Sequence, residues 1–204
     1  MYNISTSQKT QISTKGIASG GQLSGPDIYK DKIVWQELEE FADFTNLVLY
    51  NLSTQQETQI TTSGYGGVSI TGFYSFAIHD DKIVMCSPAG DDASYIMVYD
   101  LSTQETANIG SGKPLSPDIY GDRIAYEEVS WEGDYVDDPY QYYYNIYVYD
   151  LATEKGIQVS NSGTAYNPAI NSDKIVWEDR RNGNADIYMF TFSSSEVPPL
   201  DDNE

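Results

Sequence analysis

Residues 127–144 hold the side chains that are best suited to bind a ligand. Five large aromatic side chains there could stack on sugar rings or pack against a partner protein: Trp131, Tyr135, Tyr140, Tyr142 and Tyr143. Three carboxylates could hold Ca²⁺, which prefers oxygen ligands, although their spacing matches no EF-hand loop: Asp134, Asp137 and Asp138. The alternative needs no ligand, because alternating tyrosines in an extended hairpin with an acidic tip also explain the segment.

Two further aspartates, Asp27 and Asp118, take the same place in two copies of a repeat, each directly after a proline. Their carboxylates could bind a cation at the mouth of a channel if the repeats surround one. Capping at the start of a strand is the alternative role. Four oxygen-bearing side chains around Gly183 are better explained as a glycine hairpin with Asx caps than as a metal site: Asp179, Asn182, Asn184 and Asp186.

The sequence contains no recognisable set of catalytic residues. The single cysteine, Cys86, lies in an apolar run, so we expect a small core residue rather than a nucleophile. The single histidine, His79, precedes a turn, and we expect it at the opposite end of a hairpin from Cys86, too far away to form a catalytic pair. The sequence also lacks a phosphate-binding glycine loop, zinc-ligand spacing and a Gly-x-Ser-x-Gly elbow.

The chain is strongly acidic, with 31 Asp and Glu against 11 Lys and Arg in 204 residues and a net charge of −20. Such a surface repels DNA, RNA and anionic lipid, each of which needs a basic patch. It attracts cations and basic partners. The alternative explanation is that the acidic side chains only keep the protein soluble, for example in a salty medium. No stretch approaches the ~20 apolar residues of a membrane helix, and the first residues lack the basic and apolar regions of a signal peptide. We therefore expect no nucleic-acid partner and no direct membrane insertion.

A repeated unit organises the chain. Its first part is an isoleucine, two turn residues ending in aspartate, a basic residue and an apolar run, and it begins at Ile28, Ile78, Ile119 and Ile170. Its second part is an apolar and aromatic run that begins at Leu47, Ile96, Ile146 and Ile187. These short β-branched and aromatic segments between polar turns predict strands, and none has the 3.6-residue period of a helix.

Each complete repeat predicts four antiparallel strands, a pattern typical of a β-propeller blade. The turn between the first two strands has aspartate in second place, where we expect a left-handed backbone. The sequence therefore predicts one all-β domain, residues 1–192, a β-propeller with four four-stranded blades at about residues 25–61, 74–109, 116–160 and 167–192 plus 2–13. Residues 193–204 are polar, acidic and contain proline, which predicts an acidic tail or linker.

The two ends of the chain predict how the ring closes. Residues 2–13 match residues 50–61, so they carry a final strand without a blade of their own, whereas the fourth repeat stops before its final strand. We therefore expect residues 8–13 to pair beside residues 187–192 and close a monomeric four-bladed ring without exposed strand edges. The alternatives are a fragment of a longer array of blades, and two copies that complete a larger ring together.

The run Lys-Ile-Val-Trp-Glu-Asp-Arg-Arg-Asn-Gly-Asn-Ala-Asp-Ile-Tyr at residues 174–188 resembles the TolB-like (WD40-like, PD40) propeller repeat. The version with Asp-Lys-Ile-Val-Trp and Asn-Leu-Ser-Thr is similar to repeats in surface proteins of methanogenic archaea. The resemblance covers nearly all of residues 2–192 and implies propeller architecture, an envelope or surface setting, and protein or polymer binding on one face. Some relatives have lyase or peptidase-associated roles, but this chain lacks their histidine-rich or His/Arg catalytic positions.

Together these observations predict a non-catalytic binding or scaffold propeller, extracellular or on a cell surface, that recognises a protein or a glycan. One alternative is a carbohydrate-active enzyme, a lyase or hydrolase that uses carboxylates and tyrosines of the propeller face. The other is a purely structural module of an envelope layer. We expect no organic cofactor, and calcium is the one candidate metal.

Overall fold

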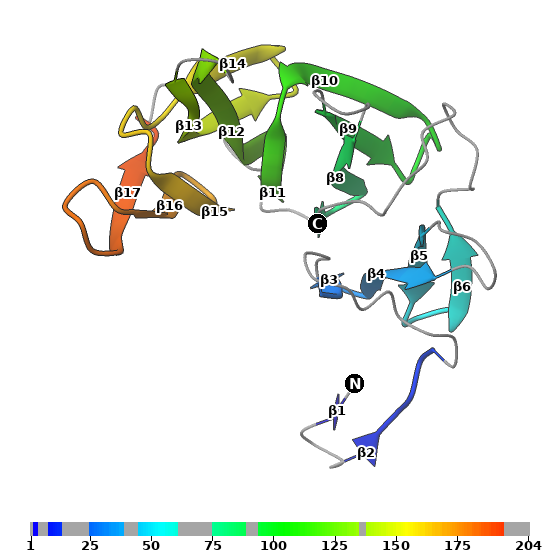
Figure 1. Ribbon diagram of the computed structural model, residues 1–204. Coiled ribbons are helices and arrows are strands. Elements are labelled where there is room, and N and C mark those ends of the chain that lie inside the picture. The colour runs from blue at the N-terminus through cyan, green and yellow to red at the C-terminus, as the bar shows by residue number, and fades with distance from the viewer. Residues whose placement is uncertain are drawn as a thin grey trace. The chain divides into compact units, whose positions relative to one another are not determined.

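The computed structural model of the chain describes residues 2–3, 8–13, 25–38, 45–60, 75–88, 94–134 and 138–193. The chain forms two compact units, Met1–Tyr74 and Ser75–Glu204. Every regular element in the described ranges is a β-strand, and Figure 1 labels these strands in chain order. The all-β class and the four antiparallel sheets that the repeats predict are confirmed.

The first unit contains one propeller blade and a short strand pair. The pair is β1 (Tyr2–Asn3) with β2 (Gln8–Lys9). Blade 1 is an antiparallel sheet in which each strand pairs with the next along the chain: β3 (Asp27–Tyr29), β4 (Lys32–Leu38), β5 (Thr45–Asn51) and β6 (Gln56–Gln59). Its central strands are the apolar runs of the repeat, which explains why they are the most buried part of the sheet.

The second unit contains three further sheets, blades 2 to 4. Blade 2 has the strands β7 (Phe76–His79), β8 (Lys82–Pro88), β9 (Ser94–Asp100) and β10 (Thr106–Gly112). Blade 3 has the strands β11 (Pro114–Tyr120), β12 (Arg123–Asp134), β13 (Asp138–Asp150) and β14 (Lys155–Gln158). Blade 4 has three strands, β15 (Ala165–Asn171), β16 (Lys174–Asp179) and β17 (Asp186–Thr191). Within the residues that the structure describes, the fourth repeat therefore has three strands, as its sequence predicts.

The same backbone hydrogen bond closes the first turn of all four blades. The carbonyl of the turn aspartate accepts an amide from the end of the third strand, at 2.7–2.8 Å: Leu52 to Asp31, Leu101 to Asp81, Leu151 to Asp122 and Phe192 to Asp173. The left-handed backbone lies on the residue before each aspartate, with φ of 49–58°: Lys30, Asp80, Gly121 and Ser172. Our expectation that the aspartate itself is left-handed is wrong, because the aspartate takes the position whose carbonyl reaches the third strand.

Blades 3 and 4 begin earlier than predicted, because their first strands each contain a bulge. The strands start at Pro114 and Ala165, two residues before the expected blade boundaries. Pairing with the second strand shifts register inside each of them. A residue with positive φ precedes a proline at each shift, Ser116 at 48° and Asn167 at 53°. The bulge accommodates the proline, which cannot donate a hydrogen bond to the ladder.

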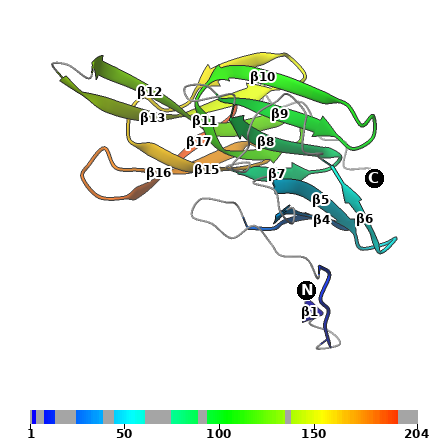
Figure 2. The same cartoon turned by 45° about the vertical axis from the view of Figure 1, so that its right-hand side comes forward.

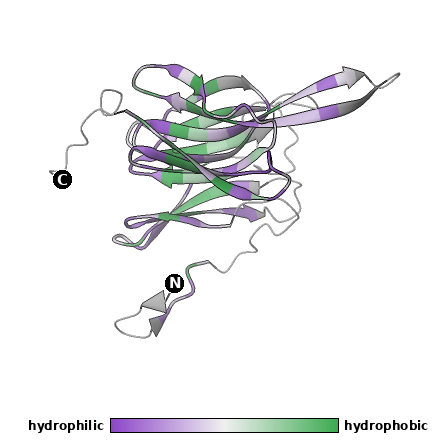
Figure 3. Ribbon diagram, turned by 90° about the vertical axis from the view of Figure 1, so that its left-hand side faces the viewer, coloured by the Kyte–Doolittle hydropathy of each residue, from purple (hydrophilic) through white to green (hydrophobic). Residues whose placement is uncertain are grey.

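Blades 2, 3 and 4 pack face to face through two apolar clusters. One joins blade 2 to blade 3 and includes Val84, Cys86, Ile96, Ile119, Ile124 and Tyr126. The other joins blade 3 to blade 4 and includes Ala125, Ile146, Val148, Ile170, Ile175 and Trp177. Figure 3 shows the hydrophobic colour concentrated in the middle of these sheets. Blade 3 contributes its two opposite faces to the two clusters, which is how a propeller buries sheets that are apolar on both sides.

A segment near the N-terminus lies against blade 1 as the end of a neighbouring blade would. Ile12 packs against Ile33, Trp35 and Val48, just as Val159, which follows β14 of blade 3, packs against the cluster shared with blade 4. In the described part of the chain, however, β2 pairs with β1 and β17 pairs with β16 alone. Closure of the ring by residues 8–13 therefore stays a prediction, as does the single domain over residues 1–192.

Candidate binding surface

The predicted insertion in blade 3 forms a long hairpin. Strands β12 and β13 pair continuously from Arg123 opposite Asp150 to Glu132 opposite Gln141, with a register shift before Asp134 meets Asp138. Figure 2 shows this hairpin extending well beyond the other strands of its sheet. The described residues of the predicted set, such as Trp131 and Tyr142, thus lie on a projection whose base belongs to the packed core of the blade.

The register divides the predicted aromatic residues between the two faces of the hairpin. Trp131 stands directly opposite Tyr142, and cross-strand partners point to the same side. Tyr143 stands opposite Ser130, one residue further along, so it points to the other side. There its hydroxyl donates to Glu132 Oε2 at 3.2 Å. The structure therefore brings Trp131 and Tyr142 together and separates Tyr143 from them.

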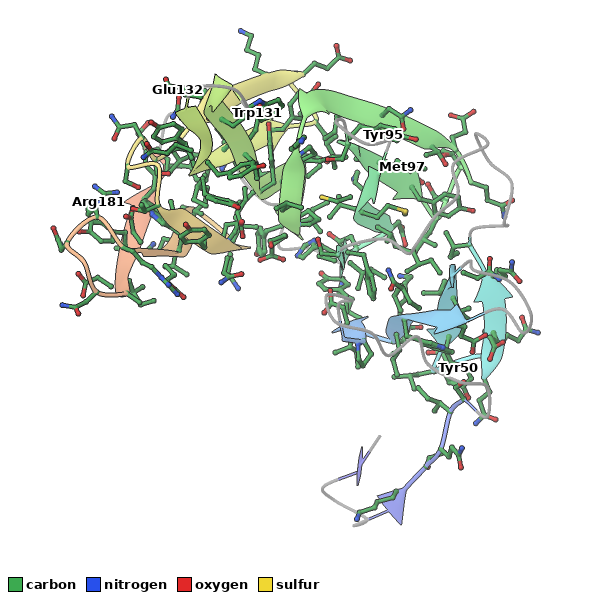
Figure 4. All side chains as sticks on the ribbon, in the orientation of Figure 1. Tyr50, Tyr95, Met97, Trp131, Glu132 and Arg181 are labelled. Atoms are coloured by element: carbon green, nitrogen blue, oxygen red, sulfur yellow. The ribbon has the colours of Figure 1, made fainter. Side chains whose placement is uncertain are left out.

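Trp131 and Tyr142 form an exposed aromatic pair, with 41% and 51% of their surfaces accessible. The ammonium of Lys113 lies 4.4 Å from the centre of the Trp131 ring, within the range of a cation–π interaction. The backbone fixes Lys113 beside the hairpin, because its carbonyl accepts the Val129 amide at 3.2 Å. The labelled side chains in Figure 4 show Trp131 with Glu132 on this part of blade 3. We call Trp131, Tyr142 and Lys113 the hairpin face.

The base of the hairpin is anchored to the segment that leads into blade 4. The ring of Tyr144 lies 4.8 Å from that of Tyr166, and the Tyr144 amide donates to the Gly163 carbonyl at 2.9 Å. The Gly163 amide in turn donates to Asn145 Oδ1 at 3.0 Å. Gly163 has φ +74°, and a Cβ there would lie 2.8 Å from Tyr143 Cδ1. Only glycine combines this backbone with so close an approach.

A buried carboxylate, Glu127, ties blade 3 to blade 4 below the hairpin face. Glu127 is 4% exposed, and its Oε1 accepts the amide of Asn167, the bulge residue of β15, at 2.7 Å. Burial raises the pKa of Glu127, although the bonds from Asn167 and Ser116 act in the opposite direction. Sequence reasoning missed this residue, because one glutamate in an acidic segment gives no signal that it is buried.

The two repeat aspartates bind backbone amides. Asp118 accepts the amide of Ile119 at 2.9 Å and that of Ile170, in blade 4, at 2.7 Å. Asp27 accepts the amide of Ile28 at 2.8 Å. These are strand-capping bonds, and Asp118 also links two blades. Within the described ranges no three Asp, Glu, His or Cys side chains are grouped as metal ligands, so a cation at Asp27 and Asp118 stays a prediction.

The acidic tip falls largely outside the described residues. Tyr135 and Asp137 are not described, and for Asp134, Asp138 and Tyr140 only the backbone is described, as part of the two strands. A calcium site at Asp134, Asp137 and Asp138 therefore also stays a prediction. No helix in the described ranges is long and apolar enough to cross a membrane.

The cysteine and the histidine have structural surroundings. Cys86 is fully buried between blades 2 and 3, and burial raises the pKa of its thiol to about 12, which keeps it from acting as a thiolate nucleophile. His79 lies at the other end of the hairpin, where its Nδ1 accepts the Gly121 amide at 3.1 Å. Its ring lies 4.5 Å from that of Tyr120, so it joins the turns of two adjacent blades.

In blade 4 a buried aspartate closes the corresponding hairpin after a short turn. The Asp179 carboxylate accepts bonds from Trp177 Nε1 at 3.2 Å, Ser162 Oγ at 2.8 Å and Thr164 Oγ1 at 3.1 Å. It also pairs with Arg181, whose guanidinium lies 4.1 Å from the Tyr188 ring. Trp35 and Glu37 repeat the tryptophan–carboxylate bond in blade 1 at 3.0 Å. That repeated spacing in the sequence is the signal that could have identified Asp179.

No protein-family model and no curated protein matches this chain. Among solved structures, TolB from Acinetobacter baumannii has a TM-score of 0.59 at 19% identity, over 80% of this chain and 40% of its own. An acylaminoacyl peptidase from Pyrococcus horikoshii has a TM-score of 0.57 at 16% identity, over 84% of this chain and 31% of its own. This chain thus spans less than half the length of either protein. The two likenesses establish a TolB-like β-propeller fold and nothing about activity.

Proposed function

We propose that this chain is a non-catalytic binding propeller that recognises a protein or a glycan through the hairpin of blade 3. The observation that carries the proposal is the pair of Trp131 and Tyr142, which stand opposite each other and are 41% and 51% exposed. Exposed Trp and Tyr side chains on a rigid support are typical of recognition sites. The fold likeness is consistent with such a role and does not specify it.

The support below the face favours a preformed site. The hairpin base is held by the tilted ring contact of Tyr144 and by hydrogen bonds of Gly163 and Asn145, and Glu127 binds the neighbouring blade. A ligand that meets an ordered face loses less entropy on binding than one that must order a loop. A surface or extracellular setting is part of the same proposal, and the resemblance to repeats of archaeal surface proteins supports it.

Closure of a four-bladed ring also belongs to this proposal. Residues 8–13 repeat the final strand of blade 1 in sequence, and Ile12 packs on blade 1 as Val159 packs towards blade 4. Among the described residues, β17 pairs on one side only, with β16. Deletion of residues 1–13 should therefore unfold the protein or make it oligomerise. A truncated chain that stays monomeric in light scattering and melts like the full chain would contradict closure.

The binding role is tested with glycan and peptide arrays probed by the full chain and by a W131A/Y142A variant. The proposal expects a ligand that binds the full chain and is lost in the variant, while the two proteins melt at the same temperature. Equal binding by both proteins, or none by either, overturns recognition by the hairpin. A calcium titration of thermal stability, with Mg²⁺ as control, tests the acidic tip separately, since Ca²⁺ tolerates its irregular oxygen geometry better than Mg²⁺.

A further inference from the structure

We infer that the hairpin face binds a basic protein segment, rich in Lys or Arg, and this inference rests on the binding role proposed above. The chain itself places a cation on the ring that is proposed to meet the partner. Lys113 Nζ lies 4.4 Å from the Trp131 ring centre. The face of an indole ring attracts ammonium and guanidinium groups through its quadrupole. Lys113 therefore shows that the exposed Trp131 ring can bind a cationic group.

Two pairs in blades 3 and 4 show the same chemistry in more enclosed places. The guanidinium of Arg123 lies 4.3 Å from the Phe192 ring, and that of Arg181 lies 4.1 Å from the Tyr188 ring. The Phe192 ring is buried in the cluster shared by blades 3 and 4, and the Tyr188 ring is partly buried. Trp131 and Tyr142 differ because both are exposed, so a cation from another molecule can reach them.

The negative charge of residues 127–144 also favours a basic partner. Residues 127–144 contain six carboxylates and no Lys or Arg: Glu127, Glu128, Glu132, Asp134, Asp137 and Asp138. Glu132 is exposed on the opposite side of the hairpin from Trp131, where it accepts the Tyr143 hydroxyl, and the whole chain carries a net charge of −20. Complementary charge steers association and excludes partners of like charge. A basic segment is attracted by the rings and by the net negative charge of the segment, whereas a neutral glycan is attracted by the rings alone and an acidic glycan is repelled.

Lys113 has a role that distinguishes these partners. It competes with an incoming cation for the Trp131 ring, and it lowers the negative charge around the face. Removal of its side chain should therefore strengthen binding of a basic peptide. For an anionic or neutral ligand the same removal should weaken binding or leave it unchanged, because a positive group beside the ring is lost.

The test is calorimetric titration of the full chain with a short Lys/Arg/Ser peptide and with peptides of equal length that carry Gln or Glu at the basic positions. We expect binding of the basic peptide only, about tenfold weaker in W131A and about threefold tighter in K113A. E132Q removes a charge on the opposite side of the hairpin, so it should weaken binding by less than about twofold and reduce its dependence on salt. The matched control I157A removes an exposed apolar side chain of blade 3 away from the hairpin, 48% accessible, and should bind like the full chain.

The outcomes separate this inference from the proposal on which it rests. Weaker binding in K113A, or a Gln peptide that binds as tightly as the basic one, overturns the basic partner. A glycan that binds the full chain but not W131A, together with no peptide binding, overturns the inference and leaves the binding role standing. No hairpin-dependent binding of peptide or glycan overturns both. Thermal melts of each variant confirm that lost binding does not reflect unfolding.

Discussion

The second strands of blades 3 and 4, β12 and β16, begin alike and end differently. Glu128 of blade 3 and Asp179 of blade 4 take equivalent places, five residues after Arg123 and Lys174. In blade 4 the carboxylate is fully buried and bonded by Trp177, Ser162, Thr164 and Arg181, and the hairpin turns at once. In blade 3 tyrosine replaces the tryptophan, Glu128 is partly exposed, and the strands run on into the projecting hairpin. The same repeat position is thus bonded within blade 4, whereas in blade 3 it precedes a projecting hairpin.

The titration of the two carboxylates reflects this difference. Burial alone raises the pKa of Glu128. Burial also raises the pKa of Asp179, but the bonds from Arg181, Ser162 and Trp177 outweigh it and hold the pKa well below its usual range. The charged form of Asp179 therefore stabilises the fold, whereas that of Glu128 does not.

The largest expected difference between the blades is in stability. D179A removes a buried carboxylate and leaves Ser162, Thr164, Trp177 and Arg181 without their shared acceptor, so it should lower the free energy of unfolding by about 3 kcal/mol. E128A should change it by less than about 1 kcal/mol. Urea unfolding of both variants measures the contrast. Equal losses of unfolding free energy in D179A and E128A would show that the hydrogen bonds of Asp179 do not stabilise blade 4 in particular.

Next in size is the dependence of stability on pH, which should have opposite signs in the two blades. Because the folded pKa of Asp179 lies below the unfolded value of 3.8, its contribution is full above that pH and is lost as pH falls further. The stability difference between wild type and D179N should therefore be about 2 kcal/mol at pH 7 and shrink below pH 3.8.

In blade 3 the raised pKa of Glu127 means that its ionised form destabilises the folded protein, and this loss of stability appears at high pH. The loss develops as pH rises above the unfolded value of 4.5. E127Q keeps an acceptor for the Asn167 amide, so it should be more stable than wild type at pH 7, and this gain should shrink as pH falls towards 4. Urea melts at three pH values test both variants. The assigned pKa directions are contradicted if the stability difference between wild type and D179N stays unchanged at low pH. They are also contradicted if E127Q stays more stable than wild type there.

The smallest contrast concerns two left-handed glycines. A Cβ at Gly163 would lie 2.8 Å from Tyr143, whereas nothing lies within 4 Å of one at Gly183, and φ is +74° and +88° respectively. Both substitutions strain the backbone, by about 1 kcal/mol. G163A should destabilise by about 1 kcal/mol more than G183A, because it also displaces the hairpin anchor. Thermal melts measure the difference, and equal destabilisation would show that Gly163 does not anchor the hairpin.

The sequence predicted the strand pattern better than it predicted the roles of polar residues. The four copies beginning at Ile28, Ile78, Ile119 and Ile170 identify the sheets, because alternation and turn chemistry act over a few residues. The roles of Glu127 and Asp179 depend on partners up to 40 residues away in sequence, which local patterns do not reveal. The separation of Tyr143 from Trp131 and Tyr142 required the cross-strand register.

The central claim is that the blade 3 hairpin serves recognition while the repeat beneath it supplies the fold. The direct test is a chimera in which residues 129–144 are replaced by residues 180–185, since Glu128 opposite Asn145 matches Asp179 opposite Asp186. We predict that the chimera folds as a monomer with a cooperative melt and loses hairpin-dependent ligand binding. A folded chimera that binds the basic peptide as tightly as the full chain, in the same titration, would contradict the claim.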